Sequence, residues 1–147
     1  LFTGAAPNKT MGSLALSPIG GGSGLLGIPG DMTPPSRFVR AAFFQTAAPK
    51  LATTTETVLQ AFHILNNFDI PVGIQFADTE SVADIPSATQ WTVSTEKKKK
   101  KIYYRTMFNS EIRYFDLAEI DFSKVKYQSE LLDKTKQQPL RKVEIKR

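Results

Sequence analysis

The apolar residues in the first half of the chain recur every three or four positions, as they do along one face of a helix. This spacing, seen between Phe38 and Ala42, predicts a helix from about Pro35 to Thr46. Proline suits the first turn, because the amide hydrogen that it lacks would have no partner there. Either Thr33 or Asp31 can cap the start of this helix.

A second stretch has the same spacing and predicts a helix from about Thr54 to Phe68, with Val58 and Phe62 on its apolar face. Thr54 or Thr55 can cap its start. Both helices are apolar over a wide stripe, so they need a packing partner in addition to one sheet. We therefore expect a further part of the protein to cover them.

From about Thr89 the pattern changes to strict alternation, which is typical of β-strands. Three stretches alternate in this way: residues 90–94, 102–108 and 112–117. Short turns at 96–100 and at Asn109-Ser110 predict an antiparallel meander. Trp91, on the first of these strands, is expected to lie in the core.

The two ends of the chain carry weaker patterns. Residues 1–34 are rich in Gly, Ser and Pro, which excludes a regular helix and leaves a flexible linker or an ordered loop. Leu25, Leu26 and Ile28 favour the ordered loop. Residues 128–147 are predicted to form a peripheral polar tail. Two helices followed by an antiparallel sheet predict an α+β fold in a single incomplete domain over residues 1–147.

Composition narrows the classes of function. The 147 residues include no cysteine and one histidine, His63, so no disulfide, thiolate metal site or cysteine nucleophile is expected within this chain. We also expect no cofactor. The net charge of +5 comes from five consecutive lysines, Lys97 to Lys101. Such a run is typical of a solvated turn, so we expect no nucleic-acid partner. No apolar run is long enough for a membrane span, and none resembles a signal peptide.

Arg37 is the one candidate for chemistry. It lies in the first turn of the first predicted helix, where the helix dipole disfavours a cation. Two explanations remain open at this point: a structural ion pair, or an anionic functional partner such as a carboxylate or a thiolate. Arg40, one turn later, is expected to reach solvent or an acidic loop.

Three segments carry a resemblance to a known family. They are "GLLGIPGDMTPPSRFVRAAF" at 24–43, "AFHILNNFDIPVG" at 61–73 and "KIYYRTMFNSEIRYFDL" at 101–117. In this order they resemble the C-terminal half of the choloylglycine hydrolase family, which includes bile salt hydrolases and penicillin V acylases. The resemblance covers roughly residues 14 to 122. It implies the C-terminal half of an αββα sandwich of the N-terminal-nucleophile hydrolase type.

The resemblance also implies a reaction and a site. Family members cleave linear amides with an N-terminal cysteine, and the first arginine of their S-R-F-V-R motif belongs to the site. That position is Arg37 here. The nucleophile and the other site residues are expected upstream of Leu1, so the chain alone is expected to be inactive.

The resemblance leaves two interpretations of function open. The first is the C-terminal portion of a cysteine-nucleophile amidohydrolase acting on bile salt or penicillin V type substrates. The second is a non-catalytic binding or structural domain that keeps half of the sandwich. Expected partners are a small-molecule amide, the N-terminal half of the same protein and further copies of the chain, with no membrane. The compartment, cytoplasmic or periplasmic, stays open.

Overall fold

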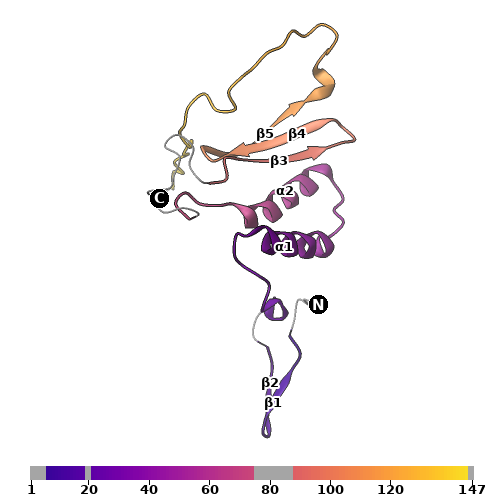
Figure 1. Cartoon of the computed structure of the whole chain (residues 1–147), viewed down its shortest axis with the longest axis vertical. Helices are drawn as coiled ribbons and strands as arrows, with labels where there is room; N and C mark the ends of the chain where they lie inside the picture. The colour runs from indigo at the N-terminus through magenta and orange to yellow at the C-terminus, as the bar shows by residue number, and fades with distance from the viewer. Residues whose placement is uncertain (1–5, 19–20, 75–87, 146–147) are drawn as a thin grey trace. The chain divides into compact units, whose positions relative to one another are not determined.

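The computed structural model describes residues 6–18, 21–74 and 88–145, and Figure 1 shows the order of their elements. The chain packs as two compact units, Leu1–Lys50 and Leu51–Arg147. The single incomplete domain expected from the sequence stays a prediction, as does the peripheral character of the tail. Among the described residues, no helix is long and apolar enough to cross a bilayer.

The first unit contains a hairpin that the sequence pattern does not predict. Its antiparallel strands, β1 (Lys9–Met11) and β2 (Leu14–Leu16), are joined through Gly12, whose φ of 62° suits glycine. A 3₁₀ turn, η1 (Ser23–Leu25), follows in the glycine-rich segment. Leu26, however, is 93% exposed, so the choice between an ordered loop and a flexible linker stays a prediction.

Helix α1 (Pro34–Ala47) completes this unit and confirms the helix predicted from about Pro35 to Thr46. Thr33 is the N-cap residue by position, but its side chain makes no capping hydrogen bond. The carboxylate of Asp31 instead accepts a hydrogen bond of 2.9 Å from the backbone amide of Thr33, the residue directly before the helix.

The second unit begins with helix α2 (Thr54–Leu65), which continues as a 3₁₀ turn, η2 (Asn66–Phe68). The two together cover the range predicted for the second helix. The cap is Thr53 rather than Thr54 or Thr55, because Thr53 and Glu56 form a reciprocal capping box. Val58 and Phe62 are the buried residues of α2.

Three antiparallel strands follow in the order β3-β4-β5: β3 (Trp91–Glu96), β4 (Lys101–Thr106) and β5 (Asn109–Asp116). The predicted meander is confirmed, but the predicted turn at Asn109-Ser110 is wrong. Thr106 pairs with Asn109, so the two-residue turn is formed by Met107 and Phe108. Polar groups fix it there, since the Thr106 hydroxyl accepts a hydrogen bond of 3.1 Å from the Asn109 amide.

Helix α2 packs against β3, on the sheet face that carries Thr92, Ser94 and Glu96 (Figure 1). The Thr54 hydroxyl donates to Glu96 at 3.3 Å and ties the helix start to this face. The opposite face, here called the apolar sheet face, carries the side chains of Trp91, Val93, Ile102, Tyr104 and Phe115. The sheet thus keeps its more apolar side away from α2.

Much of the apolar sheet face is exposed. Tyr104 is buried beneath Phe115, whose ring stacks on it at 5.0 Å between centroids, but 61% of Trp91 is exposed. The expectation that Trp91 lies in the core is therefore wrong within this chain. Residues that follow the sheet also contact it, since Arg113 of β5 forms an ion pair of 2.9 Å with Asp133.

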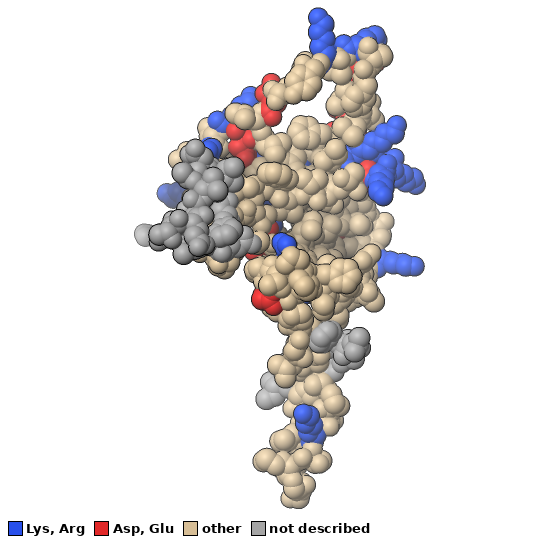
Figure 2. All heavy atoms as spheres, viewed as in Figure 1, with Lys and Arg blue, Asp and Glu red and all other residues tan. Residues whose placement is uncertain are grey.

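The lysine run forms the turn between β3 and β4, and Figure 2 shows basic side chains gathered at this place. Lys97 to Lys100 are exposed, which confirms the solvated turn. The last lysine of the run, Lys101, starts β4 and pairs with Asp116 at 3.1 Å. A short 3₁₀ turn, η3 (Leu117–Glu119), ends the sheet.

Candidate functional site

The start of helix α1 is held by one carboxylate. Oδ2 of Asp31 accepts a hydrogen bond of 2.6 Å from the Ser36 hydroxyl, and Oδ1 accepts from the hydroxyl and the amide of Thr33. These bonds, with that from Ser36 the largest cause, lower the pKa of the Asp31 carboxyl from 3.8 to about 2. A negative charge at this end also suits the helix dipole.

The lowered pKa of Asp31 predicts an acid-sensitive contribution to stability. Because the folded-state pKa lies below the unfolded value, the contribution is present above about pH 4 and disappears as the pH falls through about 2. Asp31→Asn should therefore be less stable than the wild type at neutral pH, and the difference should shrink on acidification. Thermal melts of both proteins across this range measure it. An equal difference at all pH values would contradict the role given to the carboxylate.

Arg37 follows Ser36 directly, so this network fixes its position in the first turn. Its backbone amide donates to the Thr33 carbonyl at 3.0 Å, and its side chain is half-buried. Within the described residues, its guanidinium has no hydrogen-bond or ion-pair partner. The structural ion pair considered from the sequence is thus not formed among residues 6–18, 21–74 and 88–145, and both explanations given for Arg37 stay predictions.

Arg40 differs from Arg37 in its burial and in its hydrogen bonds. Only 6% of it is exposed, and its Nη1 donates to the backbone carbonyls of Pro29 and Asp31, both at 2.7 Å. Of the two alternatives expected for Arg40, solvent is therefore wrong, and Arg40 instead binds the loop that carries Asp31, through main-chain carbonyls. Sequence reasoning missed this contact because its acceptors are main-chain oxygens, which leave no signal in side-chain patterns.

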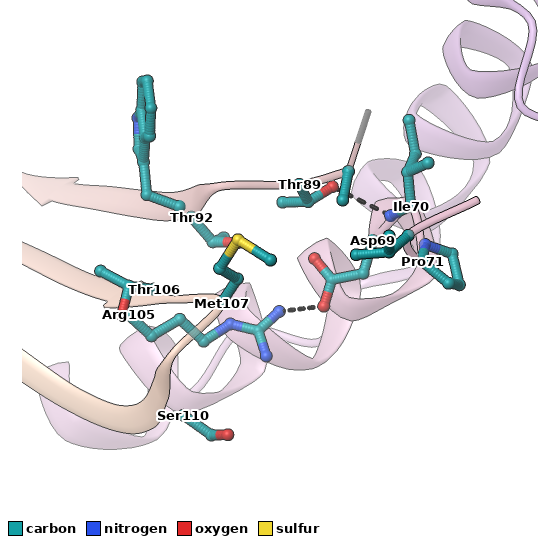
Figure 3. A pocket seen from close by; sticks show the side chains of 12 residues that line it. Asp69, Ile70, Pro71, Thr89, Thr92, Arg105, Thr106, Met107 and Ser110 are labelled. Atoms are coloured by element: carbon teal, nitrogen blue, oxygen red, sulfur yellow. Dashed lines mark hydrogen bonds and ion pairs between the residues drawn. The ribbon is translucent and has the colours of Figure 1, made fainter. Parts of the chain in front are cut away.

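The second unit contains a pocket of about 340 Å³, drawn in Figure 3. An ion pair between Asp69, which follows η2, and Arg105 of β4 crosses it. Next to Asp69, the Ile70 amide donates to the Thr89 hydroxyl at 2.9 Å. No sequence pattern pointed to the ion pair, because 36 residues separate its members.

The pocket is large enough for a small molecule, but its described lining residues include few groups that could react. Its size falls in the range of small-molecule sites, but the charge of Arg105 is already neutralised by Asp69. The lining residues that the structure describes include no histidine and no second acid. His63 lies elsewhere, exposed on α2. In the described part of the chain, no group of three His, Asp or Glu residues could hold a metal ion.

Comparison with known proteins gives consistent matches. The family described as "Linear amide C-N hydrolases, choloylglycine hydrolase family" matches residues 2–134. The bile salt hydrolase/transferase of Clostridium perfringens is 36% identical over 111 residues, which are 76% of this chain and 32% of that protein. The bile salt hydrolase/transferase of Lactiplantibacillus plantarum is 35% identical over 96 residues, which are 65% of this chain and 28% of that protein.

Solved structures that match this chain include the same kinds of hydrolase. A mutant of the conjugated bile acid hydrolase from Clostridium perfringens matches with a TM-score of 0.68 and 28% identity, over 95% of this chain and 41% of that chain. The penicillin V acylase from Agrobacterium tumefaciens matches with a TM-score of 0.56 and 28% identity. This match covers 72% of this chain and 31% of that chain. The fold is that of part of an N-terminal-nucleophile hydrolase sandwich, as the family resemblance implied. The chain spans about a third of the length of the curated relatives.

Proposed function

Because the chain belongs to the choloylglycine hydrolase family of linear amide C–N hydrolases, we propose that it is the C-terminal portion of a cysteine-nucleophile amidohydrolase. In this proposal an N-terminal portion supplies the nucleophile, and the chain supplies Arg37. The substrates are linear amides of the bile salt or penicillin V type, as the names of its relatives suggest.

The proposal rests on one observation: the guanidinium of Arg37 is half-buried and has no partner among the described residues. A half-buried guanidinium without a partner among the described residues, placed where the helix dipole is already positive, favours a negatively charged neighbour. A thiolate is such a neighbour, and a nearby guanidinium lowers the pKa of a thiol. Arg37 would thereby raise the fraction of the nucleophile in its reactive form at neutral pH.

The reaction then runs in two steps. The thiolate attacks the amide carbonyl carbon, a carbon–sulfur bond forms, and the carbon–nitrogen bond breaks as the amine leaves with a proton. Water hydrolyses the thioester, which releases the acid and restores the thiol. The family resemblance assigns the base to the α-amino group of the nucleophile. Within this chain, Arg37 stabilises the negative charge on sulfur and, after attack, on the substrate oxygen.

Two features support an N-terminal portion as the partner. The chain contains no cysteine, so a thiol nucleophile must come from another segment or chain. The apolar sheet face, with Trp91, Val93 and Phe115 exposed, is the kind of surface that a second sheet covers in a sandwich. Self-association of the chain, expected from the resemblance, stays a prediction.

The test uses a joined protein, in which the N-terminal portion of the Clostridium perfringens relative precedes this chain in one polypeptide. Amine release from a glycine-conjugated bile salt and from penicillin V is measured for the joined protein, for each part alone and for both parts mixed. We expect turnover from the joined protein and none from the chain alone. Hydrolysis by the chain alone, or a folded joined protein without activity on any linear amide, would contradict the proposal.

A further inference from the structure

Arg40 and Ser36 are the buried polar residues of α1, and both bind the segment that leads into the helix. Arg40 lies one turn beyond Arg37. Its Nη1 reaches back to two carbonyls of that segment, those of Pro29 and Asp31. Charge-assisted bonds of 2.7 Å are among the stronger hydrogen bonds in proteins, and they compensate for burying the cation.

Asp31 makes the complementary connection. Its backbone carbonyl accepts from Arg40, while its carboxylate accepts from Thr33 and from Ser36 in the first turn. One residue is therefore bound to the second turn through its main chain and to the first turn through its side chain. Together these contacts form a clamp, defined here as Arg40, Asp31 and Ser36 with the carbonyl of Pro29.

The clamp acts on Arg37 through the backbone. Arg37 lies directly after Ser36 in the sequence, and its amide donates to the carbonyl of Thr33, whose own amide binds Asp31. The hydrogen bonds of Asp31, Thr33 and Ser36 thus lie directly before Arg37 along the chain. The guanidinium of Arg37, with no partner of its own among the described residues, depends on this turn for its direction.

We propose that Arg40 is a positioning residue, which with Asp31 holds the first turn of α1 and thereby directs Arg37 toward the nucleophile. The inference rests on the role proposed for Arg37. The glycine- and proline-rich segment before the helix then has a role, because it supplies the carbonyls of Pro29 and Asp31 that Arg40 binds.

A double-mutant cycle in the joined protein tests the positioning role. Arg40→Ala should lower kcat/KM by about 10- to 100-fold through misplacement of Arg37, mainly in kcat. In the Arg37→Ala background the same change should have almost no further effect, because residues that act as a unit are not additive. Loss of thermal stability, in contrast, should be similar in both backgrounds.

Three further variants test the clamp: a conservative change at Arg40, a change at Asp31, and a control at Thr46. The bonds from Arg40 to the two carbonyls start from one nitrogen, so the ammonium of Arg40→Lys can replace part of them and should restore part of the activity. Asp31→Asn, which keeps a carbonyl but loses a charged acceptor, should show a smaller loss that also vanishes in the Arg37→Ala background. It keeps the inference testable if Arg40→Ala fails to fold. Thr46→Ala, which removes a 2.8 Å bond to a carbonyl at the far end of α1, is the matched control and should keep full activity.

The outcomes separate this inference from the proposed function. If Arg37→Ala has no effect on turnover, the function proposed for Arg37 fails. If Arg37→Ala loses activity while folded Arg40→Ala keeps it, only the positioning role fails. If both lose activity and the losses multiply in the double mutant, Arg40 acts independently of Arg37, which also overturns the positioning role.

Discussion

Replacing Arg37 by alanine in the joined protein is expected to lower kcat/KM by about 10²-fold or more, the effect of removing one preorganised electrostatic group, about 3 kcal/mol. The melting temperature should hardly change, because the guanidinium makes no hydrogen bond or ion pair within the described residues. A structural arginine would behave in the opposite way, with loss of stability and little loss of turnover.

Two further variants sharpen this expectation. Arg37→Lys should restore little activity, because an ammonium on a flexible stem lacks the planar, preorganised fork of a guanidinium. Lys98→Ala removes a positive charge from the exposed turn between β3 and β4 and should leave kcat/KM unchanged. Steady-state kinetics on the three variants, with thermal melts as a control, make the comparison. Near-wild-type turnover of Arg37→Ala would remove Arg37 from the site.

Phe62→Ala should cause the largest loss of stability, about 3–5 kcal/mol, since it empties the most buried apolar position in the described part of the chain. Only 3% of Phe62 is exposed, and it lies on α2, the helix that packs against β3. Leu59 in the same helix is 45% exposed, so Leu59→Ala should cost much less. Urea unfolding of the chain followed by far-ultraviolet circular dichroism gives both values. Equal losses would show that α2 does not pack through Phe62.

The elements with sustained periodicity were predictable from the sequence. Both helices and the three-stranded meander follow from the spacing of apolar residues, with ends correct to within a few positions. The β1–β2 hairpin could not be predicted, because strands of three residues are too short to display alternation. The second turn of the meander was misplaced because Asn and Ser favour turns in general. Here Asn109 instead begins β5 and caps the turn from its end.

The candidate site was only partly predictable. Arg37 could be singled out from its unfavourable position at a helix start, and the resemblance supplied its role. The clamp around it could not be predicted, because Arg40 binds main-chain carbonyls. The same limit applies to Asp69 and Arg105, whose contact depends on how the end of α2 meets β4. Trp91 was misjudged because alternation identifies the apolar face of a strand but not what covers it.

The pKa of the nucleophilic thiol in the joined protein, with and without Arg37, tests the central claim most directly. This chain contains no cysteine, so every thiol measured lies in the N-terminal portion. The rate of iodoacetamide modification of the N-terminal cysteine, followed by mass spectrometry across pH, gives its pKa. We predict a thiol pKa well below the ordinary value of about 8.5 in the wild type, and a value raised by at least about one unit in Arg37→Ala. Identical pH profiles for the two proteins would contradict the account.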